Sequence, residues 1–315
     1  VRGIDACLFE RTELASERVR IPEKRLDIRD VDEAELRGID AVVHLAALSN
    51  DPLGDLAPGV TEDINHRATT RLAERAKAAG VGRFVFSSSC SVYGAAGEDW
   101  LDESSPCHPV TPYAKSKLAA ERDLVELASA DFSPVSLRHA TAYGASAQLR
   151  FDLALNNLVA WATATRRIFV KSDGQAWRPF VHVEDMADAF VAVLAAEPEA
   201  THRRVLNVGA TAENYRVAEL AELVAREVPE ASIEYARDAS RDLRCYRVDC
   251  DEILRILPGF RTRWTVADGI REVAGACRAA GWRPEEFEGP RYARVEHLKA
   301  LVRAGDLSQE LRWAS

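Results

Sequence analysis

Short apolar segments alternate with longer segments of helical periodicity along the first half of the chain. Residues 41–47 (AVVHLAA) and 83–88 (RFVFSS) have the length and apolar character of buried strands, and the helix between them, rich in Ala, Arg and Glu, ends at Gly80. Another helix is predicted over 111–130, followed by a strand that begins at Val135. This alternation predicts an α/β fold in which parallel strands form a doubly wound sheet covered by helices.

The pattern changes after Gly144, where the apolar segments become shorter and more widely spaced. The elements predicted there are helices over 151–165, 183–195 and 217–228, and strands near 168–171 and 204–208. We therefore expect a first domain at residues 1–145 and a smaller α/β lobe at residues 146–315. The strand near 204–208 is expected to return to the sheet of the first domain.

Composition and charge exclude several classes of partner. With 47% hydrophobic and 29% charged residues, the 315-residue chain has the composition of a globular protein. Its net charge of −9 argues against a nucleic acid, which needs a basic face, and against an anionic membrane surface. No apolar run is long enough to span a bilayer. A phosphorylated substrate remains compatible with this charge, because a few local arginines suffice to bind it.

The six cysteines are scattered and form no Cys-x-x-Cys pair. In a chain of this size, that distribution predicts reduced thiols and a cytoplasmic location. No cluster of His, Cys, Asp and Glu has the spacing of metal ligands, so we expect no metal site.

Tyr113 and Lys117 lie four residues apart on the predicted helix over 111–130, so their side chains share one face. A serine run, residues 87–89, ends the preceding apolar strand and can meet that face. A free tyrosine has a pKa of about 10. A lysine cation and an oxidised nicotinamide nearby would favour the phenolate, so Tyr113 could act as a base near neutral pH. The combination predicts a proton-transfer site beside a redox cofactor, the alternative being a chance pair on a solvated helix.

The order of these features resembles the extended short-chain dehydrogenase/reductase family, and within it the nucleotide-sugar epimerases and dehydratases. The serine run continues as Cys90-Ser91-Val92-Tyr93-Gly94, and Pro112 begins the helix with Tyr113 and Lys117. The resemblance covers essentially the whole chain. It implies a Rossmann-type sheet that binds NAD in residues 1–145, a nucleotide-diphosphate sugar as the substrate of the lobe at 146–315, and a homodimer.

The start of the chain departs from this family pattern. Residues 1–5 (VRGID) look like the end of a second Rossmann strand, but no Gly-x-Gly-x-x-Gly precedes them. We expect that the first strand, glycine loop and helix, roughly 25–30 residues, are absent from this sequence. The alternative is a chain that begins at Val1 and has no dinucleotide site. The carboxylate of Asp5 favours NAD over NADP, because it would accept hydrogen bonds from the adenosine ribose and repel a 2′-phosphate.

The resemblance also assigns a set of cofactor contacts. Asp5 would contact the adenosine ribose, Asp27 and Ile28 the adenine, and the small side chains of Ala46 and Ala47 would let the backbone approach the cofactor. The remaining cofactor contacts that it implies are Asn65, Ser87, Tyr113, Lys117 and His139.

Arginines and amides would hold the substrate. Arg178 could bind phosphate oxygens bidentately, and Arg244 is the best placed of the nearby arginines Arg241, Arg244 and Arg247. The further substrate contacts that the resemblance implies are Ser88, Cys90, Thr141, Asn157 and Leu158. Thr141 stands where the family usually has an asparagine, so this contact is expected to be weaker or rearranged.

The catalytic residues implied are Ser89, Tyr113 and Lys117. Tyr113 would remove the proton of the sugar 4-hydroxyl while Ser89 hydrogen-bonds that oxygen, and Lys117 would bind the nicotinamide ribose. Hydride would pass to NAD and return to the other face of a 4-keto sugar. The dehydratases have Asp and Glu where this chain has Cys90 and Ser91, which argues against 4,6-dehydration. Cys90 could itself be an acid/base group, as a cysteine is in the 3,5-epimerising relatives, but those have it at the position of Ser91, which favours a packed thiol at Cys90.

We therefore expect an NAD-dependent nucleotide-sugar epimerase acting at C4. A 4-ketoreductase with the same residues is the first alternative, and a 4,6-dehydratase is a weaker one. A non-catalytic Rossmann-like binding protein is the alternative from another class.

Overall fold

A computed structural model describes residues 1–12, 21–240, 242 and 244–314. Its central element is a four-stranded parallel sheet of order β10-β6-β4-β3. The strands are β3 (Ala41–His44), β4 (Arg83–Ser89), β6 (Ser133–His139) and β10 (Val205–Val208). The α/β fold with a parallel sheet that the alternating pattern predicts is therefore confirmed, and β10 pairs with β6.

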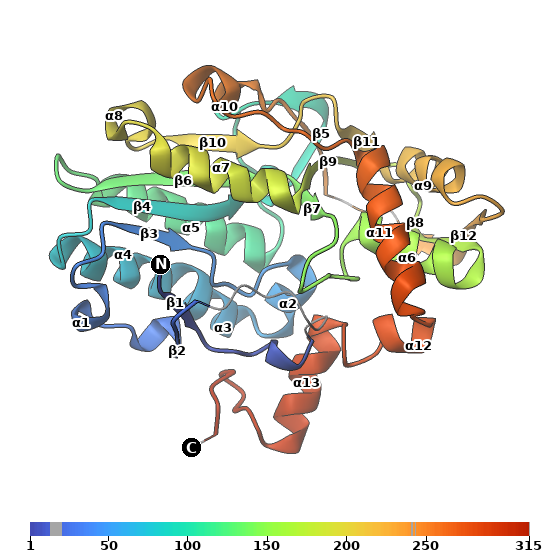
Figure 1. The fold of residues 1–315 in the computed structure, drawn as a ribbon, viewed down its shortest axis with the longest axis horizontal. Helices are drawn as coiled ribbons and strands as arrows, with labels where there is room; N and C mark the ends of the chain where they lie inside the picture. The colour runs from blue at the N-terminus through green and yellow to red at the C-terminus, as the bar shows by residue number, and fades with distance from the viewer. Residues whose placement is uncertain (13–20, 241, 243, 315) are drawn as a thin grey trace.

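Helices cover both faces of this sheet (Figure 1). Phe84 and Phe86 of β4 pack with α4 (Ala68–Ala78) and α5 (Pro112–Leu127) on one face. Val85, between them, packs with α7 (Val183–Ala195) on the other face. All three side chains are fully buried, because successive side chains of a strand point to opposite faces and both faces are covered.

A separate two-stranded parallel ribbon, β1 (Gly3–Asp5) with β2 (Glu23–Arg25), precedes the main sheet. Within the described part of the chain, β3 is paired only on its β4 side. Val43 and Leu45 are correspondingly exposed. The carboxyl ends of β1 and β3 line one cavity, described below.

The helix predicted up to Gly80 consists of α3 (Pro58–Glu62), a π turn at Asp63–Arg67, and α4. The π turn inserts one extra residue per turn into an otherwise α-helical segment. Asn65 lies in this turn and is fully buried, with its side chain against the loop that follows β3.

The second lobe has its own core, formed between strand pairs and helices. Its strands are β7 (Thr141–Tyr143), β8 (Arg167–Ser172), β9 (Trp177–His182), β11 (Asn214–Arg216) and β12 (Ser232–Ser240), and its main helices are α6 (Ala154–Thr165), α9 (Val217–Glu227) and α11 (Val266–Ala280). A further pair joins β5 (Ala95–Leu101) to β13 (Cys245–Val248). The shorter helices are α1 (Glu33–Leu36), α2 (Asp51–Leu56), α8 (Pro198–Thr201), α10 (Asp251–Ile256) and α12 (Pro284–Phe287).

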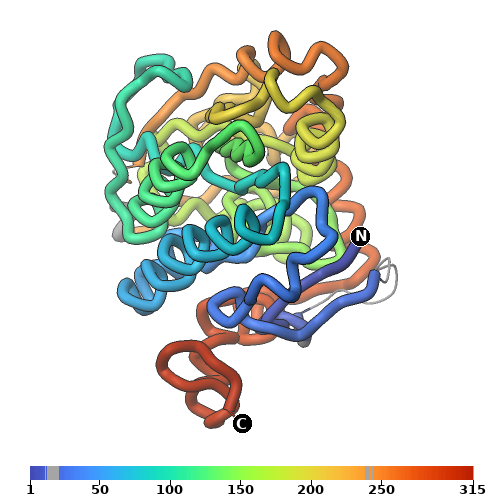
Figure 2. The backbone as a smooth tube through the Cα atoms, turned by 90° about the vertical axis from the view of Figure 1, so that its left-hand side faces the viewer, coloured from blue at the N-terminus to red at the C-terminus, as the bar shows by residue number. Residues whose placement is uncertain are grey.

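The C-terminal segment returns to the first half of the molecule (Figure 2). Leu298 and Leu301 of α13 (Arg294–Ala304) pack in one cluster with Ile28 and Leu48. The indole Nε1 of Trp313 donates to the carbonyl of Ala6 at 2.6 Å. The last part of the chain therefore lies beside the loops that follow β1 and β3.

Gly94 shapes the turn that follows the serine run. Its φ is +64°, and a Cβ there would overlap the backbone carbonyl of His108, whereas Gly97 has φ +83° and open space around it. We expect Gly94→Ala to lower the free energy of unfolding by about 2 kcal/mol or more, and Gly97→Ala by only about 1 kcal/mol. Urea denaturation of both variants measures the difference. Equal losses would mean that the contact with His108 contributes nothing.

Among the helices of the described ranges, none has the length and apolar character needed to cross a bilayer. No cluster of three or more His, Cys, Asp or Glu in this part of the chain is arranged to hold a metal ion.

Candidate functional site

A cavity of about 800 Å³ opens at the carboxyl ends of β4 and β6, where the second lobe meets the sheet. In open α/β sheets this edge is the usual place for a ligand. The predicted residues that line the cavity are Ser87, Ser88, Ser89, Tyr113, His139, Thr141, Asn157, Leu158, Arg178 and Arg244. Positions far apart in the sequence thus meet around one cavity.

Helix α5 begins where its first turn can present Tyr113 to the cavity. Thr111 caps the helix, its Oγ1 accepting from the amide of Ala114 at 3.2 Å, and Pro112 occupies the first turn. The Thr111 hydroxyl also donates to Oδ1 of Asp51 at 2.6 Å. The start of α5 is therefore fixed both by its own cap and by the loop after β3.

Tyr113 and Ser89 are hydrogen-bonded to each other in the cavity wall. Burial raises the pKa of Tyr113 to about 12, although a hydrogen bond with Ser89 lowers it. The Ser89 hydroxyl also accepts from the amide of Ser91 at 3.1 Å, which fixes its rotamer. Without a further positive charge beside the phenol, Tyr113 therefore keeps its proton at neutral pH.

Lys117 lies beneath Tyr113 and is 2% exposed. Its Nζ donates to the carbonyl of Ser87 at 2.7 Å and lies 4.6 Å from the ring centroid of Phe86 and 5.9 Å from that of Tyr113. Burial lowers the pKa of Lys117 to about 7, with a smaller opposing effect of Glu121. The lysine is held within reach of the cavity but does not itself line it.

This lowered pKa predicts a pH-dependent effect of Lys117→Met. Because the folded-state pKa of about 7 lies below the ordinary value of 10.5, the unfolded chain binds more protons between these limits, and the stability contributed by this group rises with pH. Wild type should therefore gain stability as the pH rises, whereas K117M lacks this gain. The free energy of unfolding of K117M minus that of wild type should fall by at least about 1 kcal/mol between pH 6 and pH 9.

Urea titrations at both pH values measure this change, and Lys115→Met, at an exposed position of the same helix, provides the matched control. A stability difference for K117M that does not change with pH would contradict the lowered pKa.

A buried ion pair supports the serine run from below. Nη2 of Arg138 lies 2.7 Å from Oε2 of Glu121, and the two side chains are 6% and 3% exposed. The Ser88 hydroxyl donates to Glu121, and Nη1 of Arg138 donates to the Tyr93 hydroxyl at 3.1 Å. Ser88 is therefore bonded to the network beneath it, although it also lines the cavity.

Cys90 belongs to the packing beneath the cavity. Its thiol is 1% exposed, points to the carbonyl of Arg138 at 3.2 Å, and has a pKa raised by burial. Ser91, the next residue, does line the cavity, and its buried hydroxyl has no hydrogen-bond partner in the described part of the chain. The expected substrate contact of Cys90 therefore has no counterpart in the cavity wall.

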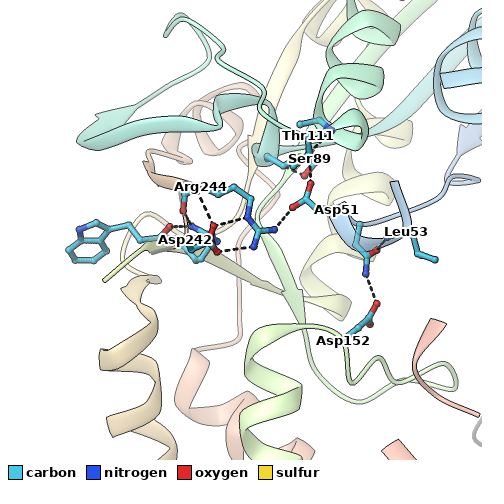
Figure 3. Close-up of polar contacts among 12 residues, drawn as sticks. Asp51, Leu53, Ser89, Thr111, Asp152, Asp242 and Arg244 are labelled. Atoms are coloured by element: carbon cyan, nitrogen blue, oxygen red, sulfur yellow. Dashed lines mark hydrogen bonds and ion pairs between the residues drawn. The ribbon is translucent and has the colours of Figure 1, made fainter. Parts of the chain in front are cut away.

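The two predicted arginines meet on one carboxylate, that of Asp242, which Figure 3 shows beside Arg244. Arg178 Nη2 lies 2.6 Å and Arg244 Nη2 lies 2.8 Å from Oδ2 of Asp242. Arg244 also pairs with Asp51, which follows β3. Although burial raises it, hydrogen bonds and charge from Arg244 and Arg178 hold the pKa of Asp242 below its usual value.

Arg247, another of the arginines named from the sequence, lies away from this cluster. Arg247 stacks between Trp100 and Trp177, with its Cζ 4.2 and 4.4 Å from the two ring centroids, and is absent from the cavity wall. Arg241 lies outside the described residues.

The side chains of Asn157 and His139 differ in their hydrogen bonding within the described residues. The Asn157 amide donates to the carbonyl of Phe151 at 2.8 Å and to Glu288 at 3.0 Å. His139 is 5% exposed, packs on Phe190 at 5.0 Å, and neither ring nitrogen has a hydrogen-bond partner among the described residues. Burial lowers the pKa of His139 to about 3, so its ring is neutral and can donate through one nitrogen and accept through the other.

A second cavity, of about 240 Å³, lies between the ends of β1 and β3. Asp5, Asp27, Ile28, Ala46 and Ala47 all line it, as the resemblance implies for an adenosine pocket. Asn65 lies behind its wall: its Oδ1 accepts from the amide of Leu48 at 2.8 Å and its Nδ2 donates to the Leu48 carbonyl at 3.1 Å. Asn65 thus holds the loop and is not itself in the wall.

The two cavities meet at Ser49, which lines both. A dinucleotide would fit this arrangement. One end is lined by small side chains and by the carboxylates of Asp5, Glu10, Glu23 and Asp27, and the other end is lined by the Tyr113 phenol and by His139, whose ring has no hydrogen-bond partner among the described residues.

Sequence reasoning missed Asp51, Asp242, Arg150 and Arg294, which also line these cavities. None of them lies in a recognisable local motif. They are recognised only from contacts with residues that are distant in the sequence, such as that of Asp51 with Arg244.

Known proteins of one family are similar to this chain. The model of the NAD dependent epimerase/dehydratase family matches residues 9–209. The chain is 31% identical over 219 residues to a UDP-glucose 4-epimerase of Streptomyces lividans, covering 64% of this chain and 66%, just under two thirds, of that relative. It is 30% identical over 256 residues to a dTDP-glucose 4,6-dehydratase of Streptomyces griseus, and the match covers 79% of this chain and 76% of that relative.

A solved structure with a similar fold is that of MoeE5 in complex with UDP-glucuronic acid and NAD. The TM-score is 0.74 at 27% identity, over 89% of this chain and 91% of that one.

Proposed function

Because this chain belongs to the NAD-dependent epimerase/dehydratase family, we propose that it is an NAD-dependent nucleotide-sugar epimerase that acts at C4 of the sugar. The observation that carries the proposal is that Ser89 and Tyr113 meet in the wall of the large cavity between the sheet and the second lobe, with Lys117 buried close to Tyr113. These residue types in this geometry suit proton transfer at a sugar hydroxyl beside a redox cofactor.

The roles of the residues follow from their positions. Tyr113 takes the proton of the sugar 4-hydroxyl, and Ser89, its hydrogen-bond partner, orients the same oxygen. Lys117 stabilises the phenolate from below through its positive charge. NAD, when bound, supplies reversible oxidation of C4. The ring nitrogens of the buried His139 have no hydrogen-bond partner among the described residues, and they would orient the cofactor by bonding to it. The large cavity leaves a 4-keto sugar room to rotate.

NAD is also the cofactor that best suits the small cavity. Asp5 at the end of β1 favours a free ribose hydroxyl over a 2′-phosphate. Asp27 and Ile28 would border the adenine, and Ala46 and Ala47 leave space for close approach to the backbone.

An epimerase is favoured over a 4,6-dehydratase by the residues after Ser89. Water elimination needs an acid and a base at these positions, but Cys90 is buried against the Arg138 carbonyl with a raised pKa, and Ser91 carries a hydroxyl. Neither side chain ionises readily near neutral pH.

The substrate diphosphate is proposed to bind at Arg178 and Arg244, which face the cavity in spite of their shared Asp242. Guanidinium groups bind phosphate oxygens bidentately. Thr141, Asn157 and Leu158 would complete the wall around the sugar and its diphosphate.

The proposal is tested by product analysis. The protein is incubated with UDP-, dTDP- and GDP-sugars and catalytic NAD, and the products are separated by anion exchange with mass detection. A new nucleotide sugar of unchanged mass supports the epimerase. A product lighter by one water would identify a dehydratase, and turnover only with a keto-sugar and excess reduced cofactor would identify a 4-ketoreductase. Bound nicotinamide without turnover would favour a non-catalytic binding protein.

We further propose that the enzyme works in the cytoplasm as a homodimer. The cysteines are free thiols, in keeping with a reducing compartment. Arg122 and Glu126 lie exposed, one turn apart, on the outer face of α5, which leaves that helix a surface for a second copy. Light scattering after size exclusion measures the mass, and a monomer at working concentration would contradict the dimer.

A further inference from the structure

Arg294 at the start of α13 reaches the small cavity from the far end of the sequence. Its Nη1 lies 3.2 Å from the Ser49 hydroxyl, its Nη2 lies 3.4 Å from Oε1 of Gln148, and its Cζ lies 4.5 Å from the ring centroid of Phe9. Ser49 and Gln148 are both neutral. Within the described residues, no carboxylate forms an ion pair with Arg294.

Although the charges of Asp152 and Asp5 act on Arg294, neither carboxylate forms an ion pair with it within the described residues. Its cationic neighbour Arg150 shares Ser49 with it, donating to the Ser49 hydroxyl at 3.1 Å. The nearby Asp152 is already paired with Arg150 at 2.8 Å. Burial first, and the charge of Arg150 second, lower the pKa of Arg294 to about 9. A partly buried guanidinium that has a like charge beside it and no ion-paired carboxylate is costly unless an anion binds there.

The position of this charge identifies the anion. Ser49 is where the small cavity, with its adenosine-type wall, joins the large cavity that holds Tyr113. A dinucleotide that spans both cavities must bring its pyrophosphate past this junction. Arginine binds phosphate oxygens through two parallel hydrogen bonds.

The helix that carries Arg294 is also firmly held. The His297 ring nitrogens lie 3.0 Å from the carbonyl of Leu8 and 3.2 Å from that of Pro290. Arg29 Nη1 donates to the carbonyl of Glu310 at 2.9 Å. These contacts attach α13 and the segment after it to the loops after β1 and β2, which border the small cavity.

We propose that Arg294 binds a phosphate of the dinucleotide at the junction of the two cavities, so that the C-terminal helix is part of the cofactor site. This inference rests on the proposed function, since it takes the cofactor to be NAD. It adds a binding residue from outside the segment that matches the family model, which ends at residue 209.

The test compares Arg294→Ala, Arg294→Lys and a matched control, Arg303→Ala, at an exposed position of the same helix. Affinities for NAD, ADP, adenosine and UDP are measured by isothermal titration calorimetry, and thermal unfolding is measured without ligand. R294A should bind NAD and ADP about 10- to 100-fold more weakly than wild type, and adenosine equally well. R294K should lose less, and R303A should match wild type.

The unfolding temperature separates binding from structure. Because R294A removes a partly buried charge that has no ion-pair partner among the described residues, its ligand-free protein should unfold at or above the wild-type temperature. The inference is overturned if R294A binds NAD within threefold of wild type, if it loses ADP and adenosine equally while unfolding at a lower temperature, or if only UDP binding weakens. A wild-type protein that binds no NAD would instead overturn the proposed function itself.

Discussion

Replacing Tyr113 by phenylalanine should lower kcat by about 100- to 10,000-fold, the range that a positioned general acid–base residue contributes. The change removes only the hydroxyl that bonds with Ser89 and that is proposed to take the substrate proton. The ring remains to fill its place at the start of α5. The affinity for NAD and the unfolding temperature should therefore stay close to those of wild type. Steady-state kinetics on the sugar identified by product analysis measure the loss.

Tyr235→Phe provides the matched control, because Tyr235 is 48% exposed and lies in β12, away from the cavity wall. Its kcat should equal that of wild type. If Y113F kept activity within threefold of wild type, Tyr113 would not be the base, whatever the effect of the other substitutions.

The second large effect concerns stability. Arg138→Met leaves the carboxylate of Glu121 buried without its cationic partner, and we expect the free energy of unfolding to fall by about 3–5 kcal/mol. The Ser88 hydroxyl still donates to Glu121, but one neutral hydrogen bond does not offset the desolvation of a charge. Urea denaturation followed by far-UV circular dichroism measures the loss.

Two controls separate the buried charge from side-chain packing. The double variant Glu121→Leu with Arg138→Met has no buried charge left and should recover most of the loss. Arg167→Met breaks the exposed ion pair with Glu234 in the second lobe and should leave the free energy of unfolding close to that of wild type. A double variant as unstable as R138M alone would show that the loss comes from packing and not from the unpaired carboxylate.

The ion pair between Arg138 and Glu121 also positions residues of the candidate site. Arg138 immediately precedes His139, and Ser88 immediately precedes Ser89, so the network fixes the ends of β4 and β6 at the cavity. Ser88 and Arg138 bond within the network, and the next residues, Ser89 and His139, line the cavity.

The secondary structure was largely predictable because it depends on local patterns. Apolar runs placed β3, β4 and β6, and the spacing of Tyr113 and Lys117 placed both on one face of α5. The π turn at Asp63–Arg67 was not predicted, since the helix has no proline or glycine to mark it there. The pairing of β5 with β13 was also missed, because strand partners depend on the whole fold.

What the sequence determined by itself is the set of features that adjacent residues specify: the parallel α/β order, the serine run at a strand end, and the Tyr113–Lys117 pair. Helix and strand periods fix the directions of neighbouring side chains, so these features can be read without coordinates. Only the tertiary structure decided that Arg244 meets Asp51, and that Arg294 meets Ser49, across separations of 193 and 245 residues. Such contacts depend on how the packed elements close around the two cavities, and no local pattern encodes that closure.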